Sequence, residues 1–348
     1  MGSCKHPLKA FAVGINPSGK TRYHICSYIT THVEINQAGQ AVACFDGKRS
    51  PYAERVVKDY IEIPCGKCYS CRMNYARDWA NRCLLEAQEH DSNYFVTFTY
   101  DNDHLPVNDF VDPVTGEIGQ TATLVKRDMQ LFFKRLRRAL DYRGDDRKLR
   151  YFMCGEYGSQ TFRPHYHAII FNLHLDDLKF YKQNDLGHNL YNSEFLQQLW
   201  PYGFVVIGEV TWETCAYTAR YILKKQYGNT AEVYERFNFV PEYTAMSRRP
   251  GIARNYYEDH KDEIYEFDEI HISTKQGGRR VKPPRYYDKL YDIDYPDESK
   301  ILHDHRKRLA ELAEEIKGKL TDREYLDRLE VEERVMMNRC RALVRKEI

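Results

Sequence analysis

Four stretches of the chain carry the apolar, β-branched and aromatic pattern that is typical of strands. Residues 94–100 and 203–210 are rich in Val, Ile, Thr and aromatic residues, which suit a pleated, half-buried surface. Residues 149–156 and 165–171 are also largely apolar, and a short segment with glycine and proline connects them. We therefore predict that this second pair forms an antiparallel hairpin.

Helical periodicity marks several segments around these strands. In residues 124–142 apolar side chains recur every three or four positions, which predicts a helix with one apolar and one basic face. Residues 70–90 and 211–226 are predicted to be helices for the same reason. Residues 300–348 are predicted to form two scaffold helices with nearly balanced charge, the second one starting at a capping box in residues 321–324.

The other segments have weaker patterns. Residues 1–63 contain short alternating stretches broken by Gly and Pro, which indicates irregular β-structure. Residues 107–122 are predicted to be a surface loop. Residues 229–299 are rich in Tyr, Pro and charged residues, and they carry few periodic signals.

The composition permits a real core and one large or two modest domains in 348 residues, of which 42% are hydrophobic. No run approaches 18 consecutive apolar residues, so we expect no membrane span. The first residues lack the apolar core of a signal peptide, which favours a cytosolic setting. Ten cysteines in a cytosolic chain indicate thiols or metal ligands rather than disulfides.

The net charge of +1 conceals a strongly basic segment. Between Lys126 and Arg150, ten Lys and Arg residues face four Asp, a local excess of +6. Such a patch attracts a phosphate backbone, although a merely solvated helix face is the alternative. Two further basic segments are predicted to be turns, and the residues expected to contact DNA are therefore Arg137, Arg138, Arg248, Arg249, Arg279 and Arg280.

Three cysteines are closely spaced: Cys65, Cys68 and Cys71. Successive Cys-x2-Cys pairs around a glycine-containing turn allow thiolates to reach one tetrahedral zinc ion. The alternative is three ordinary cysteines. A fourth ligand must come from elsewhere in the chain, and the candidates are Cys4 first, His6 second, and then Cys26 and Cys44.

A pair of histidines lies at the start of the fourth predicted strand. Residues two apart on a strand point to the same face, so His165 and His167 are expected to converge, with Ile169 continuing that face. Tyr166, Ala168 and Ile170 face the other side. The chain also contains His303-Asp304-His305, but that pair lies in a predicted charged helix, where residues two apart do not share a face.

Two tyrosines, Tyr217 and Tyr221, lie one turn apart on the predicted helix 211–226. Residues four apart share a helix face, so their hydroxyls are expected side by side. The same spacing occurs at Tyr287 and Tyr291, in a Pro-rich stretch that gives no helix signal. A metal-binding His pair followed by a helix with paired tyrosines is typical of DNA strand cleavage through a phosphotyrosine.

These motifs and their order resemble the HUH endonucleases (His-hydrophobe-His), and more closely the replication initiators of microviruses of the gokushovirus branch, which are small single-stranded DNA phages. The resemblance covers roughly residues 60–285 and rests on residues 65–72, 97–101, 104–106, 155–158, 163–167, 217–221 and 246–252. It implies an α+β fold with a central antiparallel sheet flanked by helices. It divides the chain into a Cys-rich module (1–90), a nuclease core (91–228), an accessory region (229–299) and C-terminal helices (300–348).

The resemblance also implies the chemistry. Glu156 is expected to join His165 and His167 around Mg²⁺ or Mn²⁺, and both tyrosines are expected to act as nucleophiles. Which tyrosine initiates stays open. Arg220 and Lys224 are expected to stabilise negative charge, although related initiators often have Lys at the position of Arg220.

The implied function is to nick and rejoin single-stranded DNA at a replication origin in the host bacterial cytoplasm, with a host helicase as partner and no membrane. Two alternatives are a zinc-containing DNA-binding regulator that does not cleave, and an HUH relaxase or transposase of a plasmid or mobile element. A covalent adduct with DNA would exclude the regulator.

Overall fold

The computed structural model describes residues 4–184, 187–220, 231–274 and 277–342, without the side chains of 273–274 and 340–342. It contains two compact units. The terminal unit combines the residues up to Asn74 with those from Lys307 on, and the central unit spans Tyr75–Arg306. The terminal unit thus draws on both ends of the chain, and the four-part division stays a prediction.

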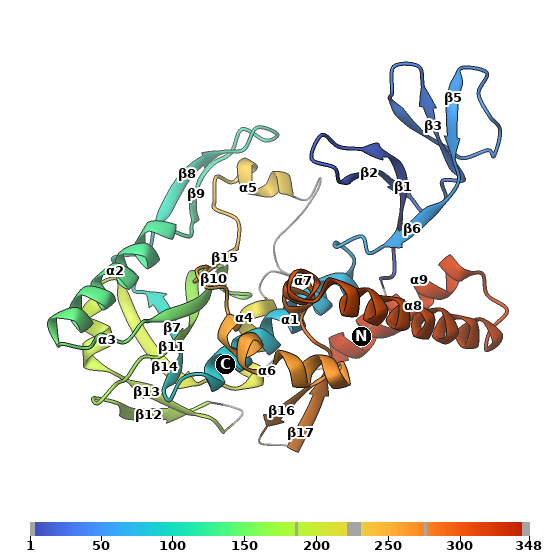
Figure 1. The fold of residues 1–348 in the computed structure, drawn as a ribbon. Coiled ribbons are helices and arrows are strands. Elements are labelled where there is room, and N and C mark those ends of the chain that lie inside the picture. The colour runs from blue at the N-terminus through green and yellow to red at the C-terminus, as the bar shows by residue number, and fades with distance from the viewer. Residues whose placement is uncertain (1–3, 185–186, 221–230, 275–276, 343–348) are drawn as a thin grey trace. The chain divides into compact units, whose positions relative to one another are not determined.

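The central unit is built on a seven-stranded sheet whose paired strands are all antiparallel. This confirms the expected α+β fold with a central antiparallel sheet between helices (Figure 1). Along the sheet, the order is β12 (Lys179–Gln183), β13 (Asn189–Asn192), β14 (Gly203–Glu209), β7 (Asn93–Tyr100), β11 (Pro164–Phe171), β10 (Arg150–Tyr157) and β15 (Tyr243–Met246).

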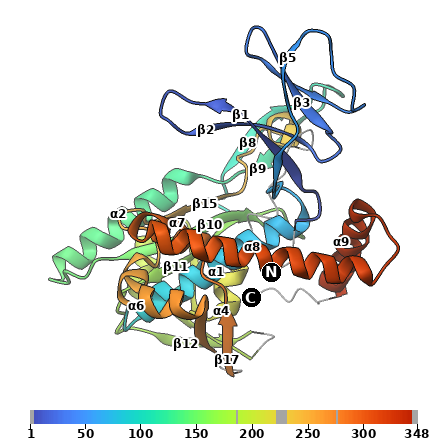
Figure 2. The ribbon, with the colours of Figure 1, turned by 45° about the vertical axis from the view of Figure 1, so that its right-hand side comes forward.

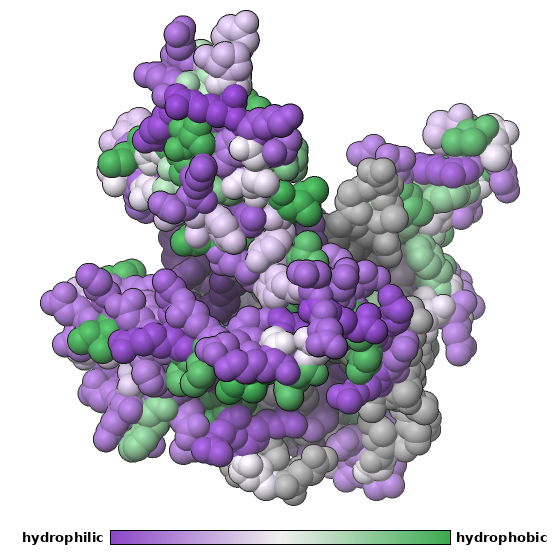
Figure 3. All heavy atoms as spheres, turned by 90° about the vertical axis from the view of Figure 1, so that its right-hand side faces the viewer, coloured by the Kyte–Doolittle hydropathy of each residue, from purple (hydrophilic) through white to green (hydrophobic). Residues whose placement is uncertain are grey.

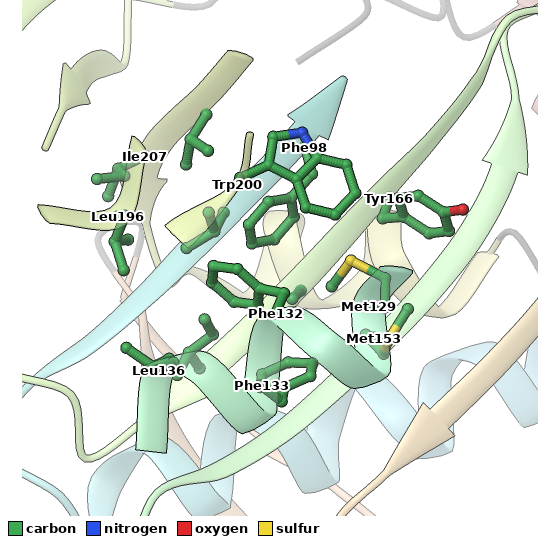
Figure 4. Close-up of a cluster of buried hydrophobic side chains, with 14 of the residues drawn as sticks. Phe98, Met129, Phe132, Phe133, Leu136, Met153, Tyr166, Leu196, Trp200 and Ile207 are labelled. Atoms are coloured by element: carbon green, nitrogen blue, oxygen red, sulfur yellow. The ribbon is translucent and has the colours of Figure 1, made fainter. Parts of the chain in front are cut away.

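One face of this sheet is covered by α2 (Lys126–Tyr142) and α3 (Glu194–Leu199), at the left of Figure 1. The apolar stripe of α2 is buried against the sheet, as its periodicity predicts. Aromatic side chains fill the space between them (Figure 4): the rings of Phe98 and Phe132 lie 4.5 Å apart, and Trp200 packs beside Phe98. Burying such large side chains provides most of the driving force for assembling this layer.

The other face is covered by α1 (Tyr69–Gln88), α4 (Trp212–Arg220), α6 (Arg254–Phe267) and α7 (Arg285–Asp294). Trp79 of α1 stacks on Phe152 of β10, with ring centroids 5.0 Å apart. Both faces of the central strands are therefore buried, which explains why β10 and β11 read as continuous apolar runs rather than as an alternation.

A buried ion pair fastens this second layer. The Arg150 guanidinium on β10 contacts the Glu86 carboxylate on α1, and both residues are less than 10% exposed. Arg150 also donates to the carbonyl oxygens of Pro250 and Gly251, while the Ala253 amide donates to Glu86. Burial alone raises the pKa of Glu86, but hydrogen bonds from His90, Arg150 and the Ala253 amide outweigh it and lower the pKa.

The terminal unit consists of two small sheets and two helices (Figure 2). One sheet has the order β2-β1-β6 and the other β4-β3-β5. The expected β-structure of residues 1–63 is confirmed, but it forms two regular three-stranded sheets rather than irregular strands. The strands are β1 (Leu8–Ile15), β2 (Thr21–Ser27), β3 (His32–Asn36), β4 (Ala41–Cys44), β5 (Ala53–Val57) and β6 (Tyr60–Ile63). The helices are α8 (Pro296–Lys319), which begins in the central unit, and α9 (Tyr325–Ala342).

The structure corrects four local expectations. Residues 107–122 are not a loop but contain a hairpin of β8 (Val107–Val111) and β9 (Ile118–Ala122). The second C-terminal helix begins at Tyr325, so residues 321–324 lie before it rather than in its first turn. Arg279 and Arg280 lie in strand β17 (Gly277–Val281), not in a turn. This strand forms a hairpin with β16 (Ile270–Thr274).

The fourth correction concerns the pair Tyr287 and Tyr291, which lies on helix α7. Tyr287 is fully buried and donates to the Ala253 carbonyl oxygen. The sequence shows no helical signal here because prolines flank the segment and charged residues interrupt its apolar stripe. Helical Tyr-x3-Tyr spacing is therefore not specific by itself in this chain.

Among the described residues, no helix has the length and apolar character needed to cross a membrane. The face of the molecule in Figure 3 is mainly hydrophilic, with apolar side chains in small separate patches.

Replacing Glu86 by Ala should lower the free energy of unfolding by about 3–5 kcal/mol, because the Arg150 guanidinium would stay buried without its partner. Since the folded-state pKa of Glu86 is lowered, its stabilisation is present above its unfolded pKa of about 4.3 and is lost as the pH falls through the folded value. Urea unfolding at pH 7 and in acid measures both effects. Gln88→Ala, at an exposed position on the same helix, should cost less than about 0.5 kcal/mol.

Candidate active site

Three potential metal ligands converge on the second face of the central sheet. Glu156 of β10 lies directly opposite His165 of β11 in the antiparallel register, and His167 follows on the same face. The Nε2 atoms of His165 and His167 lie 2.8 Å and 3.2 Å from the same Glu156 oxygen, Oε1. The structure thus brings together the three residues that the sequence and the resemblance single out.

Hydrogen bonds orient both imidazole rings. The Nδ1 atom of His165 lies 3.1 Å from the carbonyl oxygen of Arg163, which can only accept, so Nδ1 carries the proton. His165 Nε2 therefore points at the Glu156 carboxylate. Nδ1 of His167 is 3.0 Å from the Thr97 hydroxyl. Both Nε2 atoms converge on one carboxylate oxygen, which places three potential ligand atoms around one point.

The Glu156 side chain is 1% exposed. Burial alone raises the pKa of this carboxyl, but hydrogen bonds with His165 and His167 outweigh burial and hold the pKa well below its usual range. Glu156 is therefore ionised. Two imidazole nitrogens and one carboxylate oxygen form a donor set that fits a divalent cation such as Mn²⁺ or Mg²⁺.

The residues between these ligands hold the strands in place from the other face. Tyr166, between the two histidines, donates to the Val125 carbonyl oxygen at the start of α2 and contacts the Tyr100 hydroxyl at 3.0 Å. Gly155, beside Glu156, leaves room for this ring, since an added Cβ would lie only 2.8 Å from Tyr243 and 3.1 Å from Tyr166. The predicted alternation of faces along β11 is confirmed.

Helix α4 brings a tyrosine to the cluster. The ring of Tyr217 meets the ring of His167 edge-on, with centroids 5.0 Å apart, and the side chain is half-buried. Tyr221 and Lys224 lie outside the described residues. Arg220 is exposed, and its Nε donates to the Ala216 carbonyl oxygen of the same helix.

The sequence before Tyr217 explains why the helix begins here. Thr211 and Thr214 exchange side-chain to backbone hydrogen bonds, the reciprocal pattern that caps a helix start. Cys215 and Ala219 are fully buried in the layer beneath, so the helix packs against β10 and β11. The Trp212 indole donates to Asn81 of α1 at 2.9 Å, which fixes the first turn.

The basic residues do not share one face. Helix α2, with the exposed Arg137 and Arg138, covers the sheet face opposite the cluster. Sequence periodicity identifies the apolar stripe of a helix but not which face of a sheet it covers. Arg248 and Arg249 lie in an exposed turn after β15. The Arg279 guanidinium lies over the Trp212 ring, 4.7 Å from its centroid, at the start of α4.

In the terminal unit, four cysteines cluster: Cys4, Cys65, Cys68 and Cys71 have their sulfur atoms within 4.8 Å of one another. Burial alone raises the pKa of Cys68, but backbone hydrogen bonds from Lys5 and Cys71 contribute to lowering it to about 7. Four thiols in this arrangement fit a tetrahedral metal ion.

Helix α9 braces the loop that carries these cysteines. Glu333 accepts a hydrogen bond from the Tyr69 amide at 3.1 Å and contacts His6 Nε2 at 2.6 Å. His6 therefore points to the helix, and Cys4, the first choice, completes the cluster.

A family model, "Replication-associated protein ORF2/G2P", matches residues 93–226, the segment that contains both histidines and Tyr217. The replication-associated protein ORF2 of Spiroplasma virus 4 is 33% identical over 294 residues, which cover 83% of this chain and 87% of that protein. The chain belongs to the replication-associated protein ORF2/G2P family.

Two further members support this assignment. The replication-associated protein VP4 of Bdellovibrio phage phiMH2K is 34% identical over 68% of this chain and 69% of its own length. The replication-associated protein ORF4 of Chlamydia phage 1 is 33% identical over 47% of this chain and 38% of its own length. No solved structure matches the chain. The resemblance to replication proteins of small phages is thereby confirmed.

Two features of the described residues have no counterpart in the sequence predictions. An aromatic pocket of about 600 Å³ in the central unit is lined by Phe162, Tyr234, Phe237 and Phe239. Its residues come from segments with no periodic signal, so only tertiary structure assembles it. In the terminal unit, His32, Glu34 and Cys44 form a third group of potential ligands. Its only sequence signal is a His and a Glu two apart on a predicted strand.

Proposed function

We propose that this chain is a rolling-circle replication initiator, an HUH endonuclease that nicks single-stranded origin DNA and rejoins it through a 5′-phosphotyrosine. The observation that carries the proposal is the contact between Tyr217 and His167. In this contact the tyrosine of helix α4 lies against a cluster of two imidazoles and one carboxylate, which supports a tyrosine nucleophile.

Glu156, His165 and His167 would hold a Mg²⁺ or Mn²⁺ ion, which would polarise a non-bridging phosphate oxygen and offset the charge that develops on it. The chain's own contribution is orientation. The Arg163 carbonyl and the Thr97 hydroxyl fix the two rings, and such supporting hydrogen bonds commonly affect metal affinity by about 10- to 100-fold.

The nucleophile is a tyrosine hydroxyl of the α4 segment. Its oxygen attacks the phosphorus while its proton leaves, the P–O3′ bond breaks, and the 3′ oxygen takes up a proton. The new phosphotyrosine ester keeps the energy of the broken bond, so a 3′ hydroxyl can later reverse the step without ATP. With both Tyr217 and Tyr221, one tyrosine can hold the 5′ end while the other attacks the regenerated origin. Arg220 and Lys224 would stabilise phenolate or phosphate charge.

Single-stranded DNA is the proposed partner, in the host bacterial cytoplasm and together with a host helicase. The basic residues near the start of α4, with Arg279 over Trp212, lie closest to the catalytic layer. Arg137, Arg138, Arg248 and Arg249 would contact phosphates farther along the strand. The four-cysteine cluster would hold a structural Zn²⁺ ion, because tetrathiolate sets are typical of structural zinc.

Changing His165 or His167 to Ala should abolish nicking in Mg²⁺ or Mn²⁺, because the remaining two ligands cannot hold the ion. Binding of origin DNA should stay within a few-fold of wild type. A denaturing gel of labelled single-stranded DNA measures nicking, and fluorescence anisotropy measures DNA binding. His305→Ala, at an exposed position, is the matched control and should cleave normally. Full cleavage by the His165 variant would refute the metal site.

Tyr217→Phe and Tyr221→Phe should each still form some covalent adduct, because the other hydroxyl remains nearby. Strand joining should suffer more than the first cut, since it needs a second nucleophile while the first is occupied. The double variant should form no adduct, as read by denaturing gel and peptide mapping. Tyr142→Phe, at an exposed position on α2, should behave as wild type. A double variant that still forms an adduct would exclude both tyrosines and support a different nucleophile.

Replacing Arg279 and Arg280 together by Ala should weaken DNA binding for all sequences and flatten its salt dependence, since fewer counterions would be released. It should also slow cleavage at saturating DNA, because Arg279 lies over Trp212 at the start of α4. Replacing Arg137 and Arg138 should reduce the salt slope without changing the rate at saturation, because α2 covers the opposite face. If the salt dependence of DNA binding is unchanged in one of these double variants, the two arginines replaced in it face solvent and do not contact DNA.

A further inference from the structure

Strand β3 of the terminal unit buries polar side chains on the face that points away from its core. Val33 and Ile35 alternate into the small apolar cluster that they share with Phe11 and Val13. His32 and Glu34 point to the other face, yet their exposed fractions are only 3% and 7%. Buried ionisable groups are costly unless they are paired or bind a metal.

Cys44 joins these two residues from the neighbouring strand. In the antiparallel register, Cys44 of β4 lies directly opposite His32 of β3, and residues opposite each other share a sheet face. The ligand atoms of His32, Glu34 and Cys44 all lie within 4.8 Å of one another. The Glu34 carboxylate is held from a third segment, because its Oε1 accepts a hydrogen bond of 2.6 Å from the Ser50 amide.

A hydroxyl sets the tautomer of the His32 ring. Thr31 Oγ1 donates its single proton to the Cys44 carbonyl oxygen at 3.0 Å. The same oxygen lies 3.0 Å from His32 Nδ1, so it must accept there and Nδ1 carries the proton. His32 Nε2 then faces the Glu34 carboxylate at 3.3 Å. The candidate active site, where His165 faces Glu156, has the same arrangement.

We propose that His32, Glu34 and Cys44 bind a second zinc ion. A thiolate, an imidazole nitrogen and a carboxylate oxygen are all ordinary zinc ligands, and the soft sulfur favours zinc over Mg²⁺. With usual Zn–N and Zn–O bonds, two tetrahedral ligands lie about 3.3–3.4 Å apart, which matches the His32–Glu34 distance of 3.3 Å. The half-exposed Cys44 leaves the fourth position open to a water molecule.

The role of this ion is structural. The apolar cluster of the two small sheets contains only four buried hydrophobic residues among the described ones: Phe11, Val13, Val33 and Ile35. Modules with so little apolar core usually depend on metals or disulfides. An ion at this place joins β3 to β4, and the Ser50 amide connects the following loop to the same carboxylate.

The test counts zinc in the full-length chain by elemental analysis, in a His165→Ala background that disables the catalytic cluster. About two zinc ions per chain are expected, one for each site. Cys44→Ala and His32→Ala should each remove one ion, and Cys68→Ser should remove the other. Cys26→Ala is the matched control, because Cys26 is also a half-buried cysteine of this unit. The Cys26→Ala variant should lose no zinc ion.

A count of one ion in the His165→Ala parent, which only Cys68→Ser removes, would overturn the proposal and leave His32 and Glu34 as an ion pair. Circular dichroism checks that the variants fold. Should Cys44→Ala unfold, cobalt titration of the parent chain decides without any variant. Two classes of Co²⁺ site, one with strong and one with weak thiolate absorption, support the proposal, and a single class refutes it.

Discussion

The register between β10 and β11 is the constraint on which the central unit depends. Because Glu156 pairs with His165 across the strands, one carboxylate oxygen lies within hydrogen-bond distance of two imidazoles. A slip by one residue would turn every side chain of one strand to the opposite face. It would exchange His165 and His167 for Tyr166 and Ala168, bury a carboxylate against apolar rings, and leave the aromatic layer under α2 with two histidines.

The two layers that cover the sheet maintain this register. Tyr166 binds the start of α2 from one face, and Arg150, near the beginning of β10, binds Glu86 of α1 from the other. These contacts lie at opposite ends of the hairpin, so neither strand can slide without breaking one of them. The same packing positions α4, whose small buried residues Cys215 and Ala219 bring Tyr217 against His167. Stability and the geometry of the cluster therefore have the same cause.

The sequence predicts the strands and helices of the central unit well because their periodicities are strong and their burial is two-sided. It also predicts which residues of β11 share a face, since that follows from the two-residue repeat of a strand. The face that α2 covers and the helix around Tyr287 could not be predicted, because both depend on contacts between distant segments. The sequence could rank Cys4 first among the candidates for the fourth ligand of the cysteine cluster, but it could not assign it. The position of Cys4 depends on the fold of residues 4–65 and on α9.

Two of the three groups of potential ligands among the described residues show how the chain uses hydrogen bonds to orient imidazoles. At His165 a backbone carbonyl accepts from Nδ1, and at His32 a threonine hydroxyl does so after giving its own proton to the Cys44 carbonyl. Each device turns Nε2 toward a buried carboxylate. The difference lies in the third potential ligand, which is a second imidazole in the central unit and the soft thiol of Cys44, which favours zinc, in the terminal unit. In both units the strands supply the spacing that brings these side chains together.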